Sequence, residues 1–188
     1  MSKQPRRVLG IDPSLTCTGI ALVSEGGGPA GTPIYFGDIV PKGDSLQARI
    51  LDLAGAIGKL VDTFGGFGPN VSNTVVVEVP ASRPRAPRHQ DFGPRSALSL
   101  PSYGVAVGAV FMQAVLHTPG RVLTPASDEW PSRSVPRTAG DAHKEGRVRY
   151  VEGLYGLERG ALGPKTRAGN VADAVLLATA CGRPELAD

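Results

Sequence analysis

The spacing of apolar and polar residues predicts the order of the strands and helices along the first half of the chain. Short runs of β-prone residues at 7–12, 18–23 and 34–40 predict three strands of an antiparallel meander. Apolar residues then recur at helical spacing from 44 to 64, which predicts the first helix. A run of β-branched residues at 74–80 predicts a fourth strand that is buried on both faces.

The second half of the chain continues the same pattern. Apolar residues at helical spacing predict a helix over about 99–116, and a short β-prone run predicts a strand at 121–124. Two more helices are expected at 142–156 and 168–181. This order implies an α/β fold in which helices flank a mixed sheet, as in an RNase H-like domain. We expect residues 1–188 to form one domain.

Composition narrows the class of protein. A length of 188 residues with 41% hydrophobic residues is enough to bury one core. The net charge of +3 is compatible with a polyanionic partner. The longest apolar stretch is shorter than the roughly 18 to 20 residues of a membrane span, and the one near the start is too short for a signal peptide. Cys17 and Cys181 form no CxxC pair, so neither a disulfide framework nor a cysteine zinc site is expected. We therefore expect a cytoplasmic protein with no membrane partner.

Three acidic residues stand among apolar neighbours, and they are the candidates for chemistry. Asp12 ends the first predicted strand, Glu78 lies within the fourth, and Asp173 lies near the start of the last helix. Three buried carboxylates that converge would repel one another unless divalent cations neutralised them. Oxygen ligands favour Mg²⁺ or Mn²⁺ over zinc. Two such ions about 3.5 to 4 Å apart would suit hydrolysis of a phosphodiester.

Each acid also has a structural interpretation. Asp12 could cap a turn, Glu78 could pair with a buried arginine, and Asp173 could be favoured by the dipole at a helix N-terminus. Asn170 lies one turn before Asp173 on the same helical face and adds a further oxygen ligand. Taken together, the four residues favour a metal site over separate structural roles.

Several stretches of the sequence resemble the RuvC family of Holliday junction resolvases. VLGIDPSLTCTGIALV resembles the first hairpin of that family, with Asp12 at the position of its first catalytic aspartate. VVVEVP is similar to the strand with the catalytic glutamate, and GNVADAVLLATA is similar to the final acidic helix. RSALSLPSYGVAVGAV, VLTPASDEW and DAHKEGRVRYV resemble the helix, strand and lysine-bearing helix between them. The similarity spans nearly the whole chain.

The resemblance implies a RuvC-type RNase H-like fold with a mixed five-stranded sheet, and a crossover junction endodeoxyribonuclease that nicks four-way or branched DNA symmetrically. It implies that Asp12, Glu78 and Asp173 hold two Mg²⁺ or Mn²⁺ ions and that Lys144 contacts the scissile region. Asn170 is a departure, because the family usually has an aspartate or histidine there. Its amide oxygen can ligate a metal, but it carries no negative charge, so one metal site is expected to be weakened.

Two basic groups are candidates for DNA contacts. The proline-rich loop after Glu78 carries cations that suit phosphates on two converging strands, and Phe92 within it either stacks on an unpaired base or anchors the loop. The second group surrounds the penultimate helix and includes Lys144 and Arg147, although a solvated helix face would look similar. The loop cations are Arg83, Arg85, Arg88, His89 and Arg95.

Gly104 and Gly108 lie four residues apart in the second predicted helix, where they allow another element to approach closely. This pattern indicates either internal packing or, by the resemblance, a two-fold homodimer interface. A two-fold dimer would place two identical sites on a two-fold junction. A branch-migration motor protein is a further candidate partner.

Three other functions compete with junction resolution. An RNase H-fold nuclease that acts on RNA or on simple single strands would share the acids and most of the basic surface. A junction-binding protein without activity is suggested by Asn170. An actin-like ATPase or sugar kinase shares only the turn after Asp12, and it would need a second lobe for which 188 residues leave no room.

Overall fold

The structure is a computed structural model, and the description below covers six stretches of the chain. The described residues are 6–24, 31–64, 73–79, 96–118, 121–126 and 144–181. Among them, no helix combines the length and the apolar character needed to cross a membrane.

Five strands in the described residues form one mixed sheet with the order β3-β2-β1-β4-β5. The first three strands pair antiparallel, and β4 lies parallel to both β1 and β5. The meander and the mixed five-stranded sheet predicted from the sequence are therefore confirmed. The strands are β1 (Arg7–Asp12), β2 (Thr18–Ser24), β3 (Thr32–Ile39), β4 (Thr74–Val77) and β5 (Arg121–Leu123).

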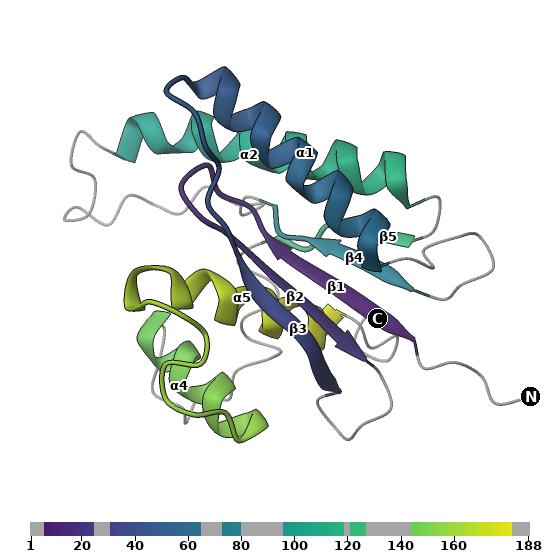
Figure 1. The fold of residues 1–188 in the computed structure, drawn as a ribbon, viewed down its shortest axis with the longest axis vertical. Helices are drawn as coiled ribbons and strands as arrows, with labels where there is room; N and C mark the ends of the chain where they lie inside the picture. Colours follow the sequence, from purple (N-terminus) through teal and green to yellow (C-terminus); the bar gives the residue numbers. More distant parts are fainter. Residues whose placement is uncertain are drawn as a thin grey trace, which may run out of the picture.

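Helices cover both faces of this sheet, as Figure 1 shows. One face carries α1 and α2, which pack against each other, and the opposite face carries α5. The remaining helix, α4, packs on α5. The α/β fold expected of an RNase H-like domain is thus confirmed. The helices are α1 (Leu46–Phe64), α2 (Ser96–His117), α4 (Lys144–Tyr155) and α5 (Lys165–Cys181).

The two-residue period of β1 sorts its side chains between two cores. Leu9 and Ile11 pack with the buried residues of α1 and α2, whereas Val8 packs with α5. Successive side chains of a strand point to opposite faces, so Gly10 and Asp12 share the face of Val8. The last residue of β1 therefore faces α5.

Two glycines let α5 approach this face closely. A Cβ atom on Gly10 would collide with the backbone carbonyl of Ala174 and with Ala178, and one on Gly19 would collide with the backbone of Asn170. The collisions are with helix backbone, which cannot move aside as a flexible side chain can. The glycines of β1 and β2 thus set the depth at which α5, and with it Asp173, lies on the sheet.

We expect alanine at Gly10 to lower the free energy of unfolding by about 1 to 3 kcal/mol, because the added methyl group overpacks the contact with α5. Alanine at Gly55, in the middle of α1, meets open space and should instead raise it by about 0.5 to 1 kcal/mol through helix propensity. Urea unfolding of the two variants measures both. Equal effects at the two positions would contradict the close approach of α5.

Two of the boundaries that differ from the sequence prediction bear on the site. The fourth strand ends at Val77, so Glu78 lies directly after it rather than inside it. The last helix begins at Lys165, three residues earlier than predicted, which places Asp173 in its third turn. An acid that far from the helix start gains little from the helix dipole, so that explanation of Asp173 is excluded.

Candidate active site

Parallel pairing of β1 and β4 places two acids side by side. Ile11 pairs with Val77, and the N–H of Glu78 donates to the carbonyl of Ile11 at 3.0 Å. The next residues in register, Asp12 and Glu78, end adjacent strands and are 8% and 7% exposed. Their side chains hydrogen-bond to each other. Two buried carboxyl groups therefore lie in contact at the strand ends.

The surroundings of Asp12 strongly disfavour its charged form. Burial raises the pKa of Asp12 well above its usual value, repulsion from Glu78 and Asp173 raises it further, and only Lys144 opposes these effects. The turn after Asp12 is closed by other side chains, since Ser14 N donates to Thr18 Oγ1 at 2.9 Å. The hydrogen bonds of this turn therefore do not explain why a carboxyl group is buried at Asp12.

Asp173 on α5 is held by two cations of α4. Arg147 Nη2 donates to Asp173 Oδ2 at 2.9 Å, and Arg147 Nε lies 2.6 Å from Oδ1 in an ion pair that is too poorly aligned to be a hydrogen bond. Lys144 Nζ lies 3.8 Å from Oδ2. Burial raises the pKa of Asp173 to about 6, Arg147 and Lys144 lower it, and Glu78 adds to the rise. Arg147 is thus a largely buried arginine that pairs with Asp173.

Asn170 is also engaged. The Lys144 ammonium donates to its Oδ1, and its Nδ2 donates to the carbonyl of Cys17 at 2.5 Å. The two contacts fix the amide, with its oxygen toward α4 and its nitrogen toward the turn before β2. Asn170 therefore ties α5 to both neighbouring elements.

The donor atoms of Asp12 and Glu78 fit a hard divalent cation, because both are buried carboxylates in direct contact. Asp173 acts on both through its charge, yet its oxygens face Arg147. Within the described stretches, no group of three or more acidic, histidine or cysteine side chains is arranged to hold a metal ion. The structure thus joins two of the four predicted ligands and turns Asp173 and Asn170 toward α4. The four-ligand set stays a prediction.

Sequence analysis missed Tyr103. This residue of α2 is partly buried and close enough to the three acids that they, after burial, raise the pKa of its hydroxyl. No local motif marks it, since only the packing of α2 over the strand ends brings it there.

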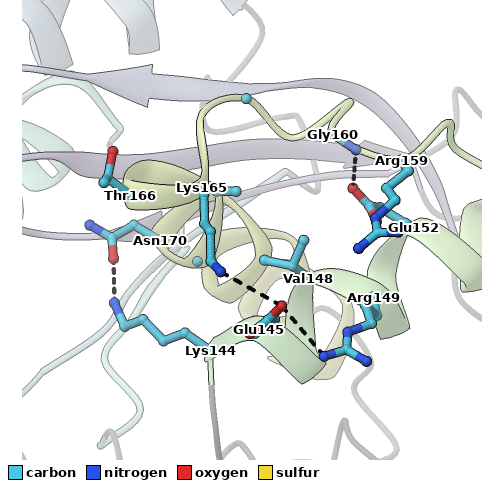
Figure 2. Close-up of a pocket in the computed structure, with 13 residues that line it drawn as sticks. Lys144, Glu145, Val148, Arg149, Glu152, Arg159, Gly160, Lys165, Thr166 and Asn170 are labelled. Atoms are coloured by element: carbon cyan, nitrogen blue, oxygen red, sulfur yellow. Dashed lines mark hydrogen bonds and ion pairs between the residues drawn. The ribbon is translucent and has the colours of Figure 1, made fainter.

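A pocket of about 460 Å³ adjoins these residues between α4 and the start of α5 (Figure 2). Lys165 and Arg149 both point toward Glu145, at 4.0 and 3.5 Å, and Lys144 reaches Asn170 at the pocket wall. The Gly160 N–H donates to Glu152 Oε1 at 2.7 Å. Cations outnumber acids in this lining. Its charged residues are Lys144, Glu145, Arg149, Glu152, Arg159 and Lys165.

Of the two predicted groups of DNA contacts, the second lies partly in the described residues and the first lies outside them. Of the second group, the Lys144 side chain is 58% exposed, whereas that of Arg147 is only 16% exposed and is turned to Asp173. The predicted loop residues lie outside the described residues: Arg83, Arg85, Arg88, His89, Phe92 and Arg95.

Solved structures with the same architecture exist. Thermus thermophilus RuvC in complex with a Holliday junction substrate superposes with a TM-score of 0.64 at 19% identity, over 94% of this chain and 92% of that one. Thermus thermophilus RuvC gives 0.63 at 21% identity, over 94% and 93%. The chain has the RuvC fold. The yeast mitochondrial Holliday junction resolvase Ydc2 gives 0.60 at 12% identity, over 96% and 79%. No protein-family model matches the sequence, and a search of curated proteins finds no significant match.

The RuvC fold accounts for the way in which distant parts of the chain meet. It places β4 beside β1 although an antiparallel hairpin and α1 separate them in sequence, and it lays α5 across both. The strand ends and the middle of α5 thereby lie close together, while the metal-binding role that the RuvC resemblance implies for Asp12, Glu78 and Asp173 stays a prediction.

Proposed function

We propose that this protein is a divalent-metal-dependent endonuclease that resolves four-way DNA junctions. One observation carries the proposal: a pair of buried carboxylates, Asp12 and Glu78, in contact at adjacent strand ends and facing Asp173. The fold supports it, since the solved RuvC structure of the same architecture is bound to a Holliday junction substrate.

In this proposal Asp12 and Glu78 hold Mg²⁺ or Mn²⁺, which supplies an activated water and neutralises charge that develops on the phosphodiester. Lys144, oriented by Asn170, presents its ammonium group beside the acids, where it can pair with a phosphate of the strand being cut. Asp173, kept in place by Arg147, adds negative charge that favours cation binding.

The pocket beside Lys144 is proposed to take the DNA backbone next to the cut. We expect the double variant Arg149→Ala with Lys165→Ala to weaken junction binding roughly three- to tenfold. The slope of log K against log salt concentration should become shallower by about one to two, because binding then releases fewer counterions. Fluorescence anisotropy over a salt series measures both. Lys59→Ala on α1, in the other layer, is the control and should change neither; equal losses would contradict this DNA path.

The exposed face of α2 is proposed as the interface of a two-fold homodimer. Gly104 and Gly108 are exposed, and a Cβ on either would meet nothing within 4 Å, so their spacing does not serve packing within the described protomer. Large apolar residues continue the same stripe and are exposed by 39 to 66%. These are Val105, Met112, Val115 and Leu116. A second copy of this face is self-complementary and has the symmetry of the junction.

Cleavage of matched substrates tests the function. We expect a four-way junction to be cut much faster than linear duplex, flap or RNA–DNA hybrid of the same sequence. Equal rates on linear duplex would contradict junction selectivity, and preference for the hybrid would favour an RNA-directed nuclease.

A second candidate function, junction binding without cleavage, is favoured by the engagement of Asn170 and Asp173 with cations of α4. Nicking assays in Mg²⁺ and in Mn²⁺, on this protein and on Asn170→Asp, separate the two. Absence of nicking by both forms would favour the binder. The single domain over residues 1–188, the cytoplasmic location and the motor protein stay predictions.

A further inference from the structure

We infer that Arg147 takes the place of a second metal ion, so that the site binds one divalent cation per protomer, between Asp12 and Glu78. The inference rests on the proposed function and revises its ion count, because the RuvC resemblance implies two ions. A second ion would need the oxygens of Asp173 and of Asn170 as ligands.

Both oxygens of Asp173 lie against one positive group, Oδ2 in a hydrogen bond and Oδ1 in an ion pair. Arg147 places Nη2 and Nε against Oδ2 and Oδ1, at 2.9 and 2.6 Å. The two side chains are 16% and 6% exposed, so water screens their attraction little. A guanidinium in this position neutralises the carboxylate as a bound ion would, and removing it would leave the buried charge with the more distant ammonium of Lys144, 3.8 Å from Oδ2.

The other ligand position is occupied in the same way. Asn170 has no charge to offer, and its Oδ1 accepts a hydrogen bond from the Lys144 ammonium. Its Nδ2 donates to the Cys17 carbonyl, which prevents the amide from turning its oxygen elsewhere without losing that bond. Lys144 and Arg147 lie three residues apart on one face of α4, so one helix supplies both cations.

The summed charge of the site residues also favours one bound ion. Asp12, Glu78 and Asp173 carry three negative charges when ionised, and Lys144 and Arg147 return two positive ones. One divalent ion turns this small negative excess into a small positive one, whereas a second ion would add two more positive charges a few ångströms from a guanidinium and an ammonium. We therefore expect the second ion to be rejected by like-charge repulsion.

Binding of Mn²⁺ to the intact protein, measured by calorimetric titration and by the free-Mn²⁺ EPR signal, tests this without reference to cleavage. We expect one tightly bound ion per protomer, and still one in Asn170→Asp, because Arg147 continues to hold Asp173. The double variant Arg147→Met with Asn170→Asp should bind two. Arg49→Met, at an exposed arginine of α1 in the other layer, is the matched control and should bind one.

The outcomes separate this inference from the proposed function. Two tight ions in the unmodified protein would overturn the inference and leave the proposed nuclease intact. No bound ion would overturn the proposed metal centre itself. A double variant that keeps its circular dichroism spectrum yet binds one ion would show that Arg147 does not exclude the second. The number of Mn²⁺ ions bound by the unmodified protein tests the inference even if the double variant does not fold.

Discussion

Asparagine at Asp12 is expected to lower junction cleavage about a thousandfold or more while leaving junction affinity within about twofold. The substitution keeps the size of the side chain and removes one of the two carboxylates in contact at the strand ends. Loss of a ligand charge weakens cation binding, and metal-assisted stabilisation of the transition state amounts to several kcal/mol. The basic residues that we propose to contact phosphates are untouched, so binding should persist.

Single-turnover cleavage and anisotropy on the same junction measure the two quantities. Because burial disfavours the charged form of Asp12, we also expect this variant to be at least as stable as the original protein. Asp62→Asn is the matched control: this acid of α1 is exposed and pairs with His117 in the other layer, so cleavage should stay within a few-fold. Loss of cleavage and binding together in Asp12→Asn would indicate a structural role instead.

Aspartates at Met112 and Leu116 are expected to convert the proposed dimer to monomers and to abolish paired incision. These side chains are 54% and 66% exposed in the protomer, so charges there cost little in the isolated fold. At a two-fold interface each copy would bury the same two charges against an apolar surface, which is strongly unfavourable.

Light scattering after size-exclusion chromatography gives the mass at several concentrations. The expected mass is twice that of the chain for the original protein and equal to it for the double variant. Leu154→Asp, at a 40% exposed position of α4, should remain dimeric. A protein that is monomeric at every concentration, or a double variant that stays dimeric, would remove α2 as the interface.

The spacing of apolar residues was sufficient to predict the order of the strands and helices that carry the site. The β1 strand has the predicted bounds, and the predicted order of all nine elements is observed. The start of α5 was predicted three residues too late. In the fold, Gly169 lies inside the helix and a Cβ there would collide with Lys144, so the glycine serves packing between helices.

The sequence could not predict which groups neutralise the acids. Arg147 was expected at the DNA surface because it belongs to a group of basic residues around this helix, and only the packing of α4 on α5 turns it toward Asp173. Tyr103 was missed for the same reason, since its approach to the acids depends on where α2 crosses the sheet. Such contacts follow from the tertiary packing of helices, which no local pattern encodes.

A supercoiled plasmid that extrudes a cruciform tests the central claim most directly, because one product reports both chemistry and symmetry. With Mg²⁺ or Mn²⁺ the account predicts linear plasmid, from two matched cuts across the junction, and no product when the metal is chelated. An intact cruciform plasmid in both metals, or equal cutting of a plasmid without the cruciform, would contradict it.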